Sequence, residues 1–246
     1  MRDIYVGNTQ DSERRGWIAG HFYPITDIRY AANVEVRHSC LLKGMGKKEW
    51  SEPVYATTFW LVLSGRLRNE YQFSDGVQTA VACNEGEYAI VLPGACHRWE
   101  VEENCQVFAV RWPSFTPSEA MPYIFPQLKS GIGQSYAIYD LSRTTLPFLV
   151  SESIQPPDLR CVSGITVRYE EYISGQIRTR YSEGGIVILA LLVHGRIDMN
   201  FPKSNHRRVA LGQNGDYVIT DTSSSHYLEA IRKATTVTVS WPLVTT

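Results

Sequence analysis

The chain has 246 residues, 43% hydrophobic and 20% charged, which is enough apolar material for one large or two ordinary globular domains. Its 24 basic and 25 acidic residues nearly cancel, and no basic stripe is found, so a nucleic-acid partner is not expected. The charged N-terminus lacks the apolar core of a signal peptide, and the longest apolar run, 186–193, is too short to span a bilayer.

Five cysteines form an odd set without a CxxC pair. An oxidising compartment favours an even, paired set, so we expect a cytoplasmic protein with no membrane partner. The near-neutral charge favours a small metabolite as the ligand or substrate.

Short β-prone segments separated by turns occupy the first half of the chain. Strands are predicted at 58–63, 66–73, 88–92 and 106–112. Ser64-Gly65 is expected to break the first pair, and Pro93-Gly94 to end the third strand. Several short strands spaced about ten residues apart are typical of a sandwich or barrel.

A proline-rich connection follows. Residues 113–157 contain seven of the twelve prolines, and such a density argues against a central strand. We expect 1–113 to form a first barrel with an N-terminal extension, 114–160 a linker, and 161–246 a second barrel. Residues 1–33 are expected to add a strand or a cover to the first barrel.

Six segments of the first half recur in the same order in the second half. The pairs are 36–44 with 167–175, 50–52 with 181–183, 61–66 with 191–196, 86–88 with 215–217, His97 with His226, and 110–113 with 239–242. The offset falls from 131 to 130 and then 129 residues, as two single-residue loop deletions would produce. One structural unit therefore occurs twice in tandem.

Each copy resembles the cupin superfamily, small β-barrels of jelly-roll type. The resemblance rests on the run from Gly86-Glu87 through Pro93-Gly94 to His97, and on a looser version from Gly215-Asp216 to His226. It covers about 34–113 and 165–242. The resemblance implies an all-β chain of two tandem cupin barrels joined by the proline-rich connection.

The chain departs from the metal-binding members of that family at the first motif, where they carry H-x-H followed by a glutamate. Neither 50–58 nor 181–186 contains a histidine. A first-row metal site needs three or more suitable protein ligands. We therefore expect no metal and no other cofactor, and an iron-dependent dioxygenase is disfavoured.

His97 and His226 occupy the one family ligand position that both copies keep, and Glu52 and Glu183 match each other near the missing histidines. A carboxylate facing an imidazole across a small cavity is a sensible acid–base pair. We predict His97 and Glu52 as catalytic residues, and His226 and Glu183 as ligand-binding residues. The alternative is that these histidines are merely held by backbone carbonyls and that Ser-Glu is a solvated turn.

Strand alternation adds two candidates. Arg111 shares a face with Val107 and Ala109, and if that face is internal it can bind a carboxylate or phosphate. His38 shares a face with Val36 and is expected to join the same cavity.

The leading interpretation is a metal-independent acid–base enzyme, an isomerase, epimerase, dehydratase or cyclase acting on a small polar metabolite. His97 would move protons in the first barrel, with the second barrel as a degenerate partner. The alternative is a non-catalytic ligand-binding or sensory protein. A homodimer is expected because two-fold assemblies are the commonest oligomers.

Overall fold

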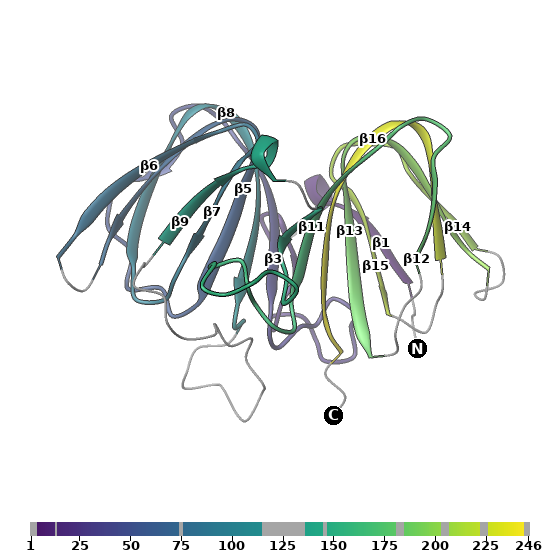
Figure 1. The fold of residues 1–246 in the computed structure, drawn as a ribbon, viewed down its shortest axis with the longest axis horizontal. Helices are drawn as coiled ribbons and strands as arrows, with labels where there is room; N and C mark the ends of the chain where they lie inside the picture. Colours follow the sequence, from purple (N-terminus) through teal and green to yellow (C-terminus); the bar gives the residue numbers. More distant parts are fainter. Residues whose placement is uncertain are drawn as a thin grey trace.

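Antiparallel strands make up nearly all of the regular structure in the computed structural model, which describes residues 4–12, 14–73, 76–114, 136–144, 147–180, 185–202, 207–221 and 226–243. The strands form two eight-stranded sheets, each curled into a barrel, and the barrels lie side by side (Figure 1). The predicted all-β fold of two tandem jelly-roll barrels is confirmed.

The first barrel contains β2 (Trp17–Ala19), β3 (Glu35–Leu41), β4 (Gly46–Lys47), β5 (Thr57–Gln72), β6 (Gln78–Asn84), β7 (Glu87–Val91), β8 (Cys96–Trp112) and β9 (Tyr136–Asp140). The second contains β1 (Ile4–Asn8), β10 (Phe148–Val150), β11 (Thr166–Tyr172), β12 (Ile177–Arg180), β13 (Ile186–Phe201), β14 (Arg207–Leu211), β15 (Asp216–Asp221) and β16 (His226–Pro242). Two short 3-10 turns, η1 (Thr9–Asp11) and η2 (Leu141–Arg143), follow β1 and β9.

The two barrels exchange their first strands. The strand order is β2-β3-β8-β5-β7-β9 in one sheet and β10-β11-β16-β13-β15-β1 in the other, so the repeat begins earlier in each copy than the motifs indicate. The expectation that the N-terminal residues add a strand to the first barrel is wrong, because β1 pairs with β15 of the second. Figure 1 shows the purple β1 on the second barrel and the teal β9 on the first.

The predicted break at Ser64-Gly65 is a bend within one long strand, β5. The pairing of β5 with β8 shifts register at this point, and Gly65 has φ +75°, with space for a Cβ closed by the carbonyl oxygen of Asn104 at 2.0 Å. Gly195 repeats this geometry in β13, with φ +94° and the Lys233 oxygen at 2.1 Å. The bend lets one strand serve both walls of its barrel.

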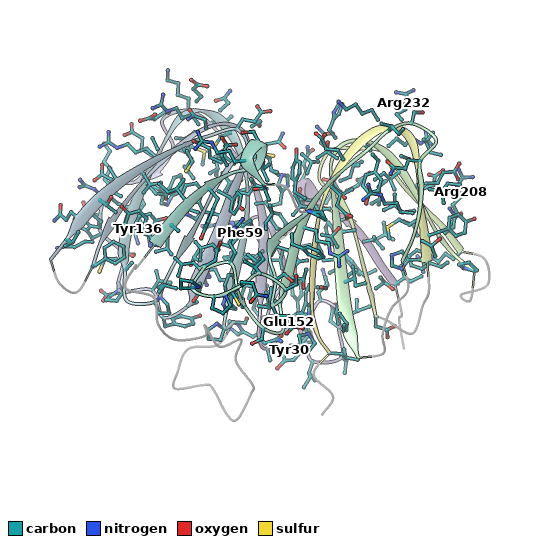
Figure 2. The ribbon with its side chains drawn as sticks, viewed as in Figure 1. Tyr30, Phe59, Tyr136, Glu152, Arg208 and Arg232 are labelled. Carbon is teal, nitrogen blue, oxygen red and sulfur yellow. The ribbon has the colours of Figure 1, made fainter. Side chains whose placement is uncertain are left out.

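Three apolar clusters stabilise the fold. One fills the first barrel, one fills the second, and the largest lies between the barrels and draws on both sheets. Along β8 the alternation is strict: Phe108 and Val110 belong to the cluster between the barrels, whereas Val107 faces the first interior. Phe59 of β5, labelled near the middle of the molecule in Figure 2, belongs to the cluster between the barrels.

A matching ion pair clasps each barrel to its neighbour. Arg29 forms a two-pronged ion pair with Asp27 in the loop after β2 and donates to the Tyr5 hydroxyl on β1 at 3.1 Å. Arg160 pairs in the same way with Asp158 and reaches the Tyr88 hydroxyl of β7 at 3.4 Å. The loop of each copy therefore docks on the other copy's barrel.

Neither of the helical turns in the described residues is long and apolar enough to cross a membrane.

Candidate functional site

A cavity of about 190 Å³ lies inside the first barrel. Strands β3, β5, β7 and β8 and the segment before β5 form its walls, and most of the lining is apolar. Its aromatic members are Trp17, Trp60, Tyr71 and Trp99. Its polar members are Arg37, Ser39, Thr58, Asn69, His97 and Arg111. Such a combination is typical of small-molecule sites.

His97 lines this cavity as predicted, and Ser51 holds it. The Ser51 Oγ lies 2.9 Å from His97 Nδ1 and accepts the His97 backbone N–H at 2.9 Å. The Ser51 backbone N–H donates to the His97 carbonyl oxygen at 2.9 Å. A hydroxyl that accepts the backbone N–H keeps its own proton for Nδ1, and in that arrangement the neutral imidazole carries its proton on Nε2.

The surroundings of His97 favour the neutral imidazole. Burial lowers its pKa below the ordinary value of 6.5, and the positive charges of Lys47 and Arg111 lower it further. A neutral imidazole at physiological pH can accept a proton or donate a hydrogen bond to a ligand.

The predicted pairing of His97 with Glu52 is not found. Glu52 is exposed and is absent from the cavity lining, whereas its neighbour Ser51 contacts the imidazole. Because the backbone of Ser51 pairs with that of His97, the side chain of the next residue is directed away from it. Ser51 belonged to the repeated Trp-Ser-Glu segment, so the repeat contained the signal but did not say which residue turned inward.

Arg111 faces the cavity, as its alternation with Val107 and Ala109 allowed. Its Nε donates to Oε2 of Glu35 on the neighbouring strand β3 at 2.9 Å, and its Nη2 contacts the same oxygen. Glu35 is buried at 2% exposure and also lies 3.4 Å from Nδ1 of His21. The carboxylate of Glu35 therefore neutralises Arg111 at the cavity wall.

Arg37 is a cavity residue that the sequence reasoning did not single out. It lies on β3 opposite Ala109 and is half-buried. Its guanidinium stacks 5.4 Å from the centre of the Trp17 ring, and its Nε donates to the Arg15 carbonyl oxygen at 3.2 Å. The arginine recurs as Arg168 in the matching segment of the second copy, and this is the signal that could have found it.

His38 does not join the cavity, contrary to expectation. The side chains of Arg37 and Ser39 on either side of it line the cavity, so His38 points to the opposite face, toward the second barrel. There it is 3% exposed and its Nδ1 lies 2.8 Å from the Thr9 hydroxyl. Burial lowers the pKa of His38 to about 4.

The second barrel is more tightly closed at the matching positions. His226 is 2% exposed and packs 5.4 Å from the Phe201 ring, whereas His97 is only partly buried. The same contrast separates Tyr172 from Leu41 and Leu228 from Trp99, the second-barrel residue being the buried one each time. Glu183, the predicted partner of His226, lies outside the described residues.

No protein-family model matches the chain, and no curated protein matches it either. Among solved structures, the formate complex of Lactobacillus farciminis oxalate decarboxylase is similar with a TM-score of 0.64 at 12% identity, over 97% of this chain and 86% of that one. A Bacillus subtilis oxalate decarboxylase is similar with a TM-score of 0.66 at 12% identity, over 98% of this chain and 77% of that one. These neighbours are bicupins, so the chain has a bicupin fold.

The similarity raises the question of a metal, since a Bacillus subtilis structure is described by its Mn(II) centres. The cavity lining contains one imidazole, His97, and no carboxylate or thiol. In the described part of the chain, no three His, Cys, Asp or Glu side chains come together. The donor set of the first barrel therefore does not fit a first-row metal, which needs three or more such ligands.

Proposed function

We propose that the chain binds a small organic molecule inside the first barrel, with His97 as a central polar contact. The observation that carries the proposal is the cavity itself, which combines an apolar, aromatic wall with a few convergent polar groups. The partly exposed His97, Leu41 and Trp99, set against their buried counterparts in the second barrel, support the first barrel as the working one.

Filling the cavity tests this proposal. Ala109 lines it from β8, so Ala109→Phe should obstruct ligand entry while the strand pairing is kept. Candidate metabolites can be screened by ligand-observed NMR, and binding confirmed by the fluorescence of Trp60 and Trp99, which line the same cavity. We expect wild-type binding and its loss in the variant. A ligand that binds both proteins equally well would place the site elsewhere.

A second candidate function is acid–base catalysis on the bound molecule, of the isomerase or lyase type and without a metal. The observation that favours it is the Ser51–His97 pair, which orients an imidazole whose pKa is lowered. Because Glu52 lies outside the cavity, His97 would transfer the proton without that carboxylate, and Arg111 would stabilise negative charge on the substrate. Incubating each identified ligand with the protein and following it by NMR separates turnover from binding.

A further inference from the structure

We infer that the ligand of the first barrel is a monocarboxylate with an apolar or aromatic body, its carboxylate held by Arg37 beside Arg111. This inference rests on the proposed function and names the class of molecule that the cavity takes. It is carried by the charges around Arg37, the position of the two guanidinium groups and the chemistry of the remaining wall.

Arg37 carries a charge that no carboxylate offsets. None of the ion pairs found among the described residues includes it. Burial lowers the pKa of Arg37, and the charged groups that add to this effect are the cations Arg111 and Arg15. A half-buried cation surrounded by cations is unfavourable unless an anion joins it.

The two arginines form one site. Arg37 and Arg111 occupy neighbouring strands on the same face, and their guanidinium groups lie 5.4 and 5.1 Å from the centre of the same Trp17 ring. Stacking on an indole fixes the plane of a guanidinium while leaving its edge N–H groups free to meet a carboxylate.

The charge count sets the charge of the ligand. Glu35 is the carboxylate bound to this pair, through Arg111. One carboxylate against two guanidinium groups leaves one positive charge, which a monoanion balances and a dianion exceeds.

The rest of the wall sets the body of the ligand. Away from the arginines the cavity presents Trp60, Tyr71, Trp99 and aliphatic side chains, with Asn69 and His97 as hydrogen-bonding groups. The Trp60 Nε1–H donates to the Tyr71 hydroxyl at 2.8 Å, so the indole nitrogen is already engaged. An apolar or flat body bearing at most one or two polar groups fits such a wall.

The test uses benzoate and its neutral isostere benzamide as probes, with tryptophan fluorescence and calorimetry as readouts. A panel of phenylacetate, hexanoate and their amides extends the comparison to other bodies. We expect the acids to bind at least tenfold more tightly than the matched amides, and phthalate, a dianion, to bind more weakly than benzoate.

Arg37→Gln should weaken benzoate binding tenfold or more while leaving benzamide binding unchanged. The matched control is Arg168→Gln, since Arg168 stacks on Phe148 at 4.4 Å in the second barrel as Arg37 does on Trp17. It should change neither affinity. Arg37→Lys, which keeps the charge and loses the fork, should give a smaller loss and guards against misfolding of the glutamine variant.

Equal affinity for acids and amides, or an unchanged benzoate affinity in Arg37→Gln, would overturn the carboxylate inference and leave the binding cavity standing. If neither acids nor amides bind, and no molecule in the wider screen is sensitive to Ala109→Phe, the proposed function fails as well.

Discussion

Ser51 and His97 are joined by three hydrogen bonds, each of 2.9 Å, two through the serine hydroxyl and one between backbones. The contact links the segment before β5 to the first residues of β8, and so fixes the imidazole against the cavity wall. A side chain fixed in this way loses little conformational freedom when a ligand binds.

Ser51→Ala should therefore weaken ligand binding about three- to tenfold, because His97 loses the group that orients it. The matched control is Glu52→Ala on the adjacent, exposed residue, which should leave the affinity unchanged. Titration calorimetry with a ligand from the screen measures both. A larger loss in the Glu52 variant would restore the carboxylate to the site.

Replacing the two equivalent histidines should separate function from stability. His97→Ala should reduce ligand affinity about tenfold or more, and, if the ligand is turned over, the rate by roughly two to four orders of magnitude. His226→Ala should instead lower the free energy of unfolding by roughly 2 kcal/mol, because it empties a buried position against Phe201. Urea unfolding and binding assays on both variants decide the matter; the opposite pattern would assign the site to the second barrel.

His38 should make the fold sensitive to acid. Its pKa is about 4 in the folded chain and about 6.5 when unfolded, so below pH 6.5 the unfolded chain binds more protons. The stability that neutral His38 confers is complete above pH 6.5 and is lost as the pH falls through 4. The loss is at most about 3 kcal/mol, from 1.4 kcal/mol for each unit of pKa difference.

Urea unfolding between pH 8 and pH 4 measures this effect. In His38→Gln the fall in stability over that window should be smaller than in the wild type. His97 has a lowered pKa as well, so His97→Gln serves as a comparison that removes the other contribution. A pH profile that is identical in His38→Gln and wild type would show that His38 is not the group responsible.

The two clasps between the barrels should contribute similarly to stability. In each, aspartate and arginine side chains are only 21–23% exposed. Asp27→Asn should lower the free energy of unfolding by about 1–3 kcal/mol, because Arg29 keeps its charge and loses its partner. Asp158→Asn should cost a similar amount, and urea unfolding compares them. A large effect from one and none from the other would mean that the structural repeat is not an energetic one.

Purified, untagged protein should carry no stoichiometric transition metal, since His97 is the one metal-binding type of side chain in the cavity lining. Elemental analysis measures the metal content directly. About one equivalent of metal per chain, lost on chelation together with ligand binding or turnover, would contradict both the donor count and the metal-independent chemistry.

The sequence by itself determined the architecture. Paired glycines such as Gly65 and Gly195 and the recurring closing strands specify the same bends and the same strand order twice, because a bulge of this kind tolerates only glycine. The alternation of β8 likewise separated Arg111 from Phe108 correctly, since successive side chains point to opposite faces of a strand.

Tertiary structure decided which face was the inside. Strand β3 is covered on one face by its own cavity and on the other by the second barrel, so both faces carry buried residues and period-two alternation cannot rank them. His38 was assigned to the wrong face and Arg37 was passed over for this reason. The choice between Ser51 and Glu52 also depended on the pairing of that segment with the backbone of His97, a contact across 46 residues.

The exchange of β1 and β9 had the same origin. Two sheets of equal strand order offer equivalent edges at β7 and β15, and the sequence of a short edge strand does not name the one that it will join. Local sequence determined the strands, their bends and their two faces, because these depend on neighbouring residues. The cavity and its charged pair arose only when the two barrels packed together, because that packing decides which residues water can reach.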